Sequence, residues 1–187
     1  MMTSRIKAVA APYSEDVQKA FDTIMPAGMV PLNIFTSVAN NPRILQRMVA
    51  GGLLDKGTIS IQAREIIILR TCALCKAEYE WGVHVAGFAL KAKLTQAQID
   101  DTLSANINRS LWNDEQASLL ALADELHTTQ GISDALWLSL SDHFSHEQSI
   151  ELIMLAGLYH AVSFIVNGLK VPNEAFAPSF PHSLEVK

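Results

Sequence analysis

Four side chains in one short stretch of the chain have types and spacings that could do chemistry. Glu80 and His84 are four positions apart, which places them on one face of a helix. An imidazole beside a carboxylate can transfer protons near neutral pH. Cys72 and Cys75 form a Cys-x-x-Cys pair just before them, which raises the alternative of redox chemistry. These residues therefore leave acid/base chemistry and thiol chemistry open.

Each of these residues also has a structural interpretation. His84 can be a core or interface histidine, and Glu65, which opens an apolar helix pattern upstream, can simply pair with an arginine such as Arg64. Both thiols lie in an apolar segment, where burial raises the pKa of a thiol and lowers its reactivity. On this interpretation Cys72 and Cys75 are inert core residues.

Aromatic and basic residues near the cluster are candidates for binding a substrate. Tyr79 and Trp81 flank Glu80, and their amphipathic rings are typical of pocket walls and of packed interfaces. Arg70 or Arg43 could hold a substrate carboxylate, because a guanidinium binds a carboxylate in bidentate fashion. We therefore predict that the two aromatic residues line the pocket and that one of these arginines binds a carboxylate.

The other histidines give little support for a metal site. Neither an H-x-x-x-H nor an H-E-x-x-H pattern occurs in the chain. We interpret His127, His143 and His146 as solvated residues near helix ends. Tyr159 and His160 fit the core of a long helix. The sequence therefore predicts no metal and no cofactor.

The elements that would position these residues are all predicted to be helices. Helices are expected over residues 14–24, 42–50, from 60, from 77, from 95, and over 114–127, 134–144 and 145–168. Thr95 with Gln98, and Ser145 with Gln148, form capping-box patterns. The β-branched run 66–68 is compatible with a strand, but the good helix formers around it favour a helix. Residues 34–38 form an apolar segment without an assigned element.

The length of 187 residues suits one domain. We expect a single all-helical domain over residues 1–171 and an extended tail over 172–187. Pro172, Pro178 and Pro181 make a helix in the tail unfavourable. Such a tail is either disordered or lies across a neighbouring subunit.

Composition excludes some classes of protein. The net charge of −5 and the lack of a Lys/Arg-rich run argue against nucleic-acid binding. Charged residues make up 18%, below the roughly 25% typical of soluble domains, so we expect apolar surface to be buried in a homo-oligomer. Residues 150–169 are apolar enough to suggest a membrane span, but Glu151, His160 and Asn167 favour a core helix. With two cysteines and no recognisable export signal, we expect a cytoplasmic protein without a membrane partner.

Glu65 followed by Tyr79-Glu80-Trp81, with His84 four residues past Glu80, resembles the carboxymuconolactone decarboxylase family. The flanking segments NPRILQRMVAGGLL and VPNE resemble one branch of that family, the alkylhydroperoxidase D-like proteins. The resemblance covers roughly residues 35–175. It implies an all-α, alkylhydroperoxidase D-like bundle of six to eight helices that assembles as a trimer or hexamer.

The family has two known chemistries, and the register of the motif separates them. One is decarboxylation of 4-carboxymuconolactone; the other is peroxide reduction by a Cys-x-x-Cys pair assisted by the Glu and the His. In the peroxidase branch the first Cys follows the Glu by twelve residues and the second precedes the His by four. Here these positions hold Ala77 and Glu80, and the actual thiol pair lies five residues too early. The resemblance therefore implies the decarboxylase-type trio of Glu65, Glu80 and His84.

We accordingly expect an acid/base enzyme that acts on a small carboxylated lactone or related acid. His84 would be the principal acid/base, Glu80 would hold its orientation as an anion near a helix N-terminus, and Glu65 would be a second proton carrier. One alternative is a thiol peroxidase that uses Cys72 and Cys75. The other is a non-catalytic protein that binds a small molecule within the same fold.

Overall fold

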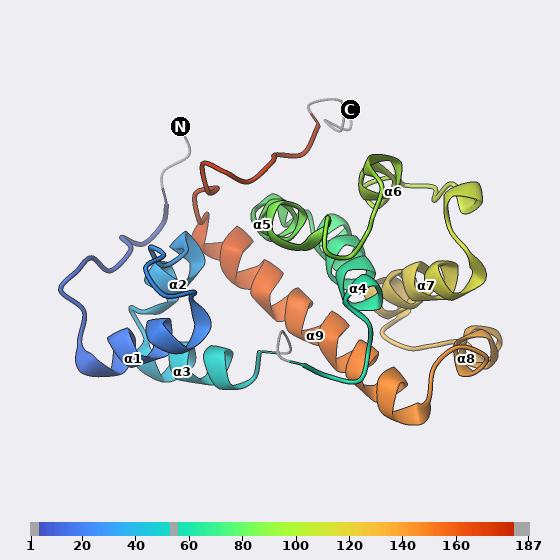
Figure 1. Ribbon diagram of the computed structural model, residues 1–187, viewed down its shortest axis with the longest axis horizontal. Helices are drawn as coiled ribbons and strands as arrows, with labels where there is room; N and C mark the ends of the chain where they lie inside the picture. The colour runs from blue at the N-terminus through green and yellow to red at the C-terminus, as the bar shows by residue number, and fades with distance from the viewer. Residues whose placement is uncertain (1–3, 53–55, 182–187) are drawn as a thin grey trace.

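A computed structural model describes residues 4–52 and 56–181, and all regular secondary structure in this part of the chain is helical. It contains nine α-helices, one 3-10 helix and no strand, which confirms the all-α class. The longest helix, α9 (His146–Leu169), crosses the middle of the molecule between two groups of helices (Figure 1). These two groups supply the two sides of the site described below.

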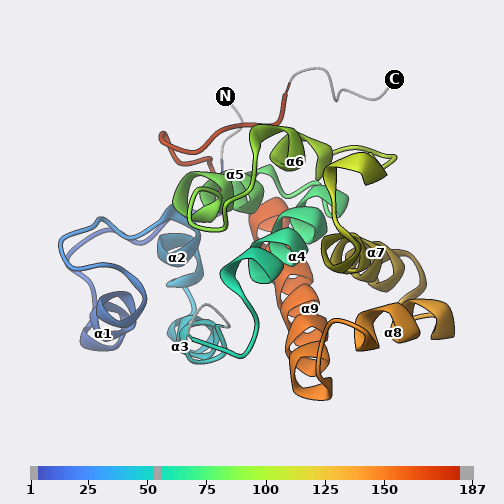
Figure 2. The same ribbon diagram turned by 45° about the vertical axis from the view of Figure 1, so that its right-hand side comes forward.

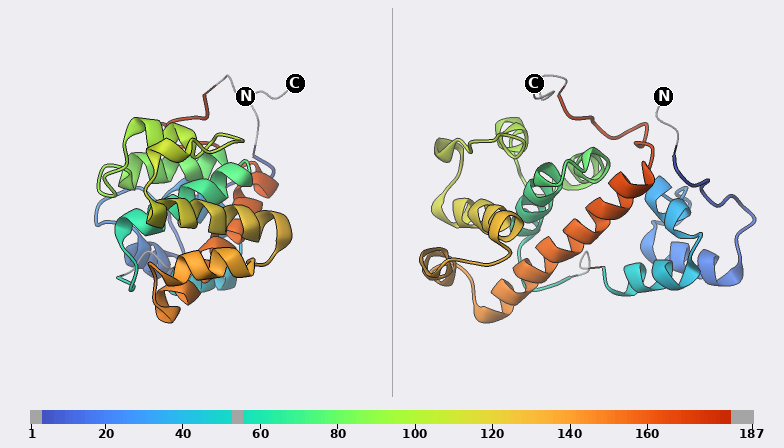
Figure 3. Two further views of the ribbon diagram at one scale, coloured as in Figure 1. Left: turned by 90° about the vertical axis from the view of Figure 1, so that its right-hand side faces the viewer. Right: turned by 180° about the vertical axis from the view of Figure 1, so that it is seen from behind.

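The smaller group lies on one side of α9 and comes from the N-terminal part of the chain (Figure 3). It consists of α1 (Glu15–Ile24), α2 (Asn33–Val38) and α3 (Pro42–Ala50). Helix α2 was not assigned from the sequence, and it takes the number of described α-helices to nine, one above the expected maximum. All but its first residue are buried, and Leu32 at its N-cap offers no side-chain cap. Neither periodicity nor a cap therefore marked this helix.

The larger group lies on the other side of α9. It consists of α4 (Ile61–Leu74), α5 (Glu78–Phe88), α6 (Gln96–Asp101), η1 (Arg109–Leu111), α7 (Asp114–Thr129) and α8 (Asp134–Ser141). Helix α4 packs against α5, α7 and α9, and Figure 2 shows it crossing in front of α9. The run 66–68 is helical and fully buried, so α4 is the core helix of this group.

Side-chain caps fix where the main helices begin. The capping boxes predicted at Thr95 and Ser145 both form, and Asn113 forms a third, so α6, α7 and α9 each begin at a satisfied cap. The hydroxyl of Ser60 caps α4 by accepting a hydrogen bond from the backbone N–H of Ala63, without the reciprocal bond of a capping box. Ser14, at the N-cap of α1, makes no side-chain cap bond.

A tight corner joins α4 to α5. Lys76 has a left-handed φ of 54°, and the backbone N–H of Ala77 donates to the carbonyl oxygen of Cys72 at 2.8 Å. This is the hydrogen bond of a Schellman turn, which ends one helix and redirects the chain. The corner brings the first turns of α5 alongside α4, so residues distant in the sequence can meet between the two helices.

The tail over residues 172–181 lies along α5 of its own chain (Figure 1). The side chain of Glu174 accepts hydrogen bonds from the hydroxyl of Tyr79 at 2.6 Å and from the backbone N–H of Asn33 at 2.6 Å. The tail therefore joins α5 to the start of α2. This corrects the expectation of a tail that is disordered or laid across a neighbouring subunit; the part of that prediction on residues 182–187 lies outside the described residues.

Gly82 is a point of close approach between the tail and α5. A Cβ atom at this position would lie 2.3 Å from the backbone oxygen of Pro178, so an alanine would displace the tail. We expect Gly82→Ala to lower the free energy of unfolding by about 1–3 kcal/mol, measured by urea denaturation. Gly157→Ala in α9 is the matched control, because nothing lies within 4 Å of a Cβ built there. It should raise stability by about 0.5–1 kcal/mol, and equal losses in both variants would contradict the role of Gly82.

Among the described residues, α9 is the one helix that is long and apolar enough, by length and composition, to cross a membrane. Leu152, Leu155 and Ala156 on its inner side are fully buried in the helical core. Its outer side carries Ile150 and Phe164, which are 64% and 69% exposed. Such an exposed apolar face is compatible with the expected homo-oligomer, which stays a prediction.

Candidate active site

A buried hydrogen bond joins Glu65 of α4 to His84 of α5. The Nδ1 atom of His84 lies 2.7 Å from Oε2 of Glu65, and the two residues are 2% and 0% exposed. The other oxygen of Glu65 accepts a hydrogen bond from Nε of Arg64 at 2.9 Å. Because a carboxylate can only accept hydrogen bonds, Nδ1 carries a proton, and in the neutral form of the imidazole this is the single N–H proton of the ring. The lone pair of Nε2 is then available on the other side of the ring.

Tyr159 of α9 contacts that second nitrogen. Its hydroxyl lies 2.8 Å from Nε2 of His84, to which it donates a hydrogen bond in this tautomer. Burial, with the charge of Glu80 adding to it, raises the pKa of Tyr159 well above its ordinary value, so the hydroxyl stays protonated. The sequence analysis placed Tyr159 in a helix core, and its separation of 75 residues from His84 gave no signal of this contact.

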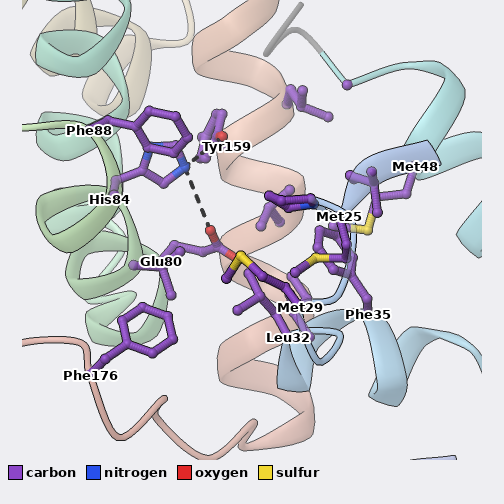
Figure 4. Close-up of a pocket in the computed structure, with 18 of the residues that line it drawn as sticks. Met25, Met29, Leu32, Phe35, Met48, Glu80, His84, Phe88, Tyr159 and Phe176 are labelled. Atoms are coloured by element: carbon purple, nitrogen blue, oxygen red, sulfur yellow. Dashed lines mark hydrogen bonds and ion pairs between the residues drawn. The ribbon is translucent and has the colours of Figure 1, made fainter. Parts of the chain in front are cut away.

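Glu80 lies close to the same nitrogen of His84. Its Oε2 atom is 4.0 Å from Nε2 (Figure 4). This is too long for a direct hydrogen bond, but one water or one substrate oxygen can bridge the gap. Burial raises the pKa of Glu80 from 4.5 to about 7; the charge of His84 opposes the shift and that of Glu174 adds to it. Glu80 can therefore hold or release a proton near neutral pH, which corrects the expectation of an anion fixed by a helix N-terminus.

The geometry reverses the roles expected for the two carboxylates. Glu65, and not Glu80, holds the orientation of the imidazole, because it makes the direct hydrogen bond to Nδ1. Glu80 suits the role of proton carrier, because its pKa lies near 7. The spacing of Glu80 and His84 indicated a shared helix face. It could not show that the corner after α4 brings Glu65 closer to the ring.

The raised pKa of Glu80 makes stability depend on pH. Between its unfolded value of 4.5 and its folded value of about 7, the folded protein binds this proton more tightly, so the free energy of unfolding falls as pH rises. We expect wild type to lose about 3 kcal/mol relative to Glu80→Gln between about pH 4 and pH 8. Urea denaturation of both proteins across this range measures the difference. A difference that stays constant with pH would contradict the raised pKa.

Glu80, His84 and Tyr159 all line one cavity of about 350 Å³ (Figure 4). Most of the other side chains around it are apolar. The side chains that line the cavity from the N-terminal helices and the tail include Met25, Met29, Leu32, Phe35, Met48 and Phe176. Methionines are flexible and adapt to the shape of a bound molecule. The site can therefore take a small and largely apolar ligand next to a group of proton donors and acceptors.

Lys91 is the basic residue at the cavity, histidine apart, among the described residues that line it. Its Nζ atom lies 5.5 Å from the centre of the Phe88 ring, which in turn stacks on the imidazole of His84. Lys91 is exposed to solvent at the edge of the cavity. It is the residue in this wall that can attract a substrate carboxylate, and the sequence analysis did not single it out.

The two arginines predicted to bind a carboxylate lie elsewhere, which corrects that prediction. Arg70 is buried and pairs with Asp124, with 2.6 Å between Nε and Oδ1. It also donates to the carbonyl oxygens of Thr102 and Ser104, so its guanidinium serves the packing of α4. Arg43 is exposed on α3 and does not line the cavity.

Tyr79 and Trp81 do not line the cavity either, which corrects their assignment to its walls. Both are buried, and both hold α5 in place through hydrogen bonds. The hydroxyl of Tyr79 accepts from the backbone N–H of Ile34 at 3.1 Å, in addition to its bond to Glu174. The indole N–H of Trp81 donates to the hydroxyl of Thr102 at 3.1 Å. These residues position the site without facing a ligand.

Neither thiol lines the cavity. Cys72 is fully buried and Cys75 is half-buried. Burial raises the pKa of both thiols, and for Cys72 the negative charge of Glu80 raises it further. Cys75 lies at the C-terminal end of α4, where the helix dipole also disfavours a thiolate. Both positions therefore oppose the formation of the nucleophilic thiolate that a peroxidase needs.

A protein-family model for the carboxymuconolactone decarboxylase family matches residues 42–124. This segment of the chain, about 44% of its length, is therefore similar to that family. The matched segment runs from the start of α3 into α7 and contains Glu65, Glu80 and His84. Tyr159 and the cavity residues of α1 and α2 lie outside it. The matched segment thus holds the trio, and the rest of the chain completes the cavity.

Solved structures confirm the alkylhydroperoxidase D-like fold. An alkylhydroperoxidase AhpD core, an uncharacterized peroxidase-related protein from Ralstonia eutropha JMP134, is 19% identical over 92% of this chain and 93% of its own, with a TM-score of 0.78. A peroxidase-related protein from Silicibacter sp. TM1040 is 19% identical over 95% and 96%, with a TM-score of 0.77. The debrominase Bmp8 in its apo form is 14% identical over 90% and 91%, with a TM-score of 0.72. Comparison with curated proteins gave no significant match.

Proposed function

We propose that the protein is an acid/base enzyme of the decarboxylase type, which removes CO₂ from a small carboxylated lactone or related carbonyl acid. The observation that supports this proposal most directly is the arrangement around Nε2 of His84. Glu65 orients the ring from one side, while the hydroxyl of Tyr159 and the carboxyl group of Glu80 approach the other side at the wall of the cavity. The hydroxyl of Tyr159 and the carboxyl group of Glu80 are two titratable groups in different environments, and both thus lie within reach of one substrate.

The cavity supports a substrate of limited size and polarity. Its volume of about 350 Å³ lies near the lower end of small-molecule sites, so one substituted ring fills it. An apolar wall favours a substrate whose carboxylate turns into neutral CO₂ during the reaction. Lys91 would attract that carboxylate, and the carbonyl oxygen of the substrate would lie between His84 and Glu80.

The proposed reaction needs a proton donor and a site for developing negative charge. The bond between the substrate carbon and its carboxylate breaks, and the electron pair moves into the neighbouring carbonyl group to form an enolate. A hydrogen bond from protonated Glu80 stabilises the enolate oxygen. Glu80 then gives its proton to the carbon that lost CO₂, and water returns a proton to Glu80. The His84–Glu65 pair holds Tyr159 and supplies a second path for protons.

Peroxide reduction through Cys72 and Cys75 is the alternative enzyme function. The names of two similar structures, which call those proteins peroxidase-related, favour it. The burial of Cys72 and the position of both thiols outside the cavity oppose it. A protein that binds a small molecule without turning it over is the remaining alternative, because a shared fold does not determine activity.

A paired assay tests the proposal. Purified protein is incubated with 4-carboxymuconolactone and CO₂ release is measured, while a second sample receives hydrogen peroxide and its free thiols are titrated. We expect CO₂ release, slow loss of thiols, and unimpaired CO₂ release per folded molecule in a Cys72→Ala, Cys75→Ser double variant. Rapid, peroxide-dependent loss of both thiols without CO₂ release would favour the peroxidase and overturn the proposal.

Lys91 offers a test of substrate binding within the same function. We expect Lys91→Met to raise the KM for a carboxylated substrate about 10- to 100-fold with little change in kcat, because a charge-assisted hydrogen bond contributes about 1.5–3 kcal/mol. Steady-state kinetics of CO₂ release measures both constants. Lys93→Gln removes an exposed positive charge that does not line the cavity, so it should leave KM unchanged. Equal effects of the two variants on KM would mean that Lys91 acts only through the electrostatic potential of the protein surface and does not bind the carboxylate directly.

A further inference from the structure

Three metal-binding side chains from three helices meet at a place separate from the cavity. They are Cys75 at the end of α4, His127 in the last turns of α7 and His160 in the middle of α9. The Sγ atom of Cys75 lies 3.9 Å from Nδ1 of His127, which lies 3.0 Å from Nε2 of His160. These three atoms all lie within 4.8 Å of one another. None of the three residues lines the cavity.

These separations are close to those of a tetrahedral zinc site. With Zn–S near 2.3 Å and Zn–N near 2.0–2.1 Å, tetrahedral angles place a sulfur and a nitrogen ligand about 3.6 Å apart and two nitrogen ligands about 3.4 Å apart. The observed 3.9 Å between Cys75 and His127 and 3.0 Å between His127 and His160 each differ from these values by a few tenths of an ångström. Small rotations of the side chains would therefore suffice to bring the three atoms around one ion.

The surroundings of His160 and Cys75 also favour the binding of a metal ion. Nδ1 of His160 lies 2.8 Å from the carbonyl oxygen of Ala156, to which it can only donate, so the lone pair of Nε2 points toward His127. A backbone carbonyl on the outer ring nitrogen is the usual way in which proteins orient a metal-binding histidine. The side chain of Asn167 donates to the carbonyl oxygen of Cys75 at 2.8 Å and fixes that residue against α9.

We propose that Cys75, His127 and His160 form a Zn²⁺ site. A thiolate and two imidazoles are the ligands that Zn²⁺ prefers, and all three residues are half-buried, so a water molecule can reach the fourth position. The ion would connect the ends of α4 and α7 to the middle of α9. Sequence spacing gave no sign of the site, because Cys75 and His160 lie 52 and 33 residues from His127.

Metal titration of the full chain without an affinity tag tests the site. The protein is reduced, stripped with a chelator and titrated with Co²⁺, whose visible spectrum reports tetrahedral coordination and whose near-ultraviolet spectrum reports a thiolate ligand. We expect one Co²⁺ per chain, displaced by one Zn²⁺, with both spectral signatures. Competition with a chromophoric chelator gives the affinity for Zn²⁺.

Matched variants locate the ion. Cys75→Ser should abolish the thiolate band, and His127→Gln should weaken Zn²⁺ binding by more than about 100-fold, the upper end of what loss of a ligand's hydrogen-bond partner costs. Cys72→Ala and His143→Gln, which alter a thiol and an exposed histidine outside the cluster, should bind as wild type. Circular dichroism verifies folding, and if Cys75→Ser does not fold, His127→Gln decides. Wild type that binds no stoichiometric metal, or binding that survives His127→Gln but not His84→Gln, would overturn the proposal. The outcome does not depend on the decarboxylase assay.

Discussion

Replacing His84 with glutamine is expected to lower kcat/KM for CO₂ release by about 10²–10⁴-fold, the usual contribution of a positioned acid/base group. The imidazole is the group that Glu65 orients, that Tyr159 contacts and that Glu80 approaches. Glutamine can fill part of the ring's volume but cannot exchange a proton near neutral pH. Steady-state kinetics on 4-carboxymuconolactone measures the loss.

Folding must be separated from chemistry in this variant, because His84 is buried. Circular dichroism and a thermal unfolding curve provide the check, and activity is expressed per folded molecule. His143→Gln is the matched control, since His143 is exposed in the turn after α8 and should keep full activity. A folded His84→Gln protein with wild-type kcat/KM would remove His84 from the mechanism.

Replacing Glu65 with alanine is expected to lower the free energy of unfolding by about 3–5 kcal/mol, the range observed when one partner of a buried charged pair is removed. The side chain of Glu65 is fully buried and accepts from Arg64 on one oxygen and contacts His84 with the other. The variant loses the carboxylate that Arg64 and His84 both contact. Because the site is buried, water does not replace that carboxylate. Urea denaturation at neutral pH measures the change.

Glu15→Ala is the comparison for that experiment. Glu15 is an exposed glutamate in the first turn of α1, where it interacts favourably with the helix dipole, so its loss should cost no more than about 1 kcal/mol. If Glu65→Ala is as stable as Glu15→Ala, then the hydrogen bonds of Glu65 do not stabilise the fold, and its role is confined to orienting His84.

Most of the fold could be predicted from local patterns. Capping residues such as Ser60 and Ser145 mark helix starts within a few positions, because the cap and the first turn are neighbours in the chain. Helix α2 was missed for a physical reason: it is short and buried almost all round, so tertiary packing and not an amphipathic pattern defines it. The packing of the tail on α5 was missed because it depends on the distant contact of Glu174 with Tyr79.

The site was predictable only where its residues are neighbours in the sequence. Glu80 and His84 share a helix face through their spacing, and the family resemblance added Glu65. The environment then decided the roles: desolvation raises the pKa of Glu80, and the corner after α4 brings Glu65 to the ring. Tyr159 comes from a helix far along the chain, so no local pattern could identify it. Arg70 has the right side chain for binding a carboxylate, but its guanidinium is buried and already pairs with Asp124, which the sequence could not show.

The walls of the cavity have a consequence for how the proposed enzyme could acquire new substrates. The groups proposed to move protons lie on α4, α5 and α9, whereas Met25, Met29 and Phe176, which shape the space beside them, come from the two ends of the chain. Glu174 ties those ends together through the N–H of Asn33. An exchange of one end with that of a relative would break this tie, while an exchange of both would keep it. We therefore expect the two ends to change together when ligand specificity changes, while the groups proposed to move protons stay the same.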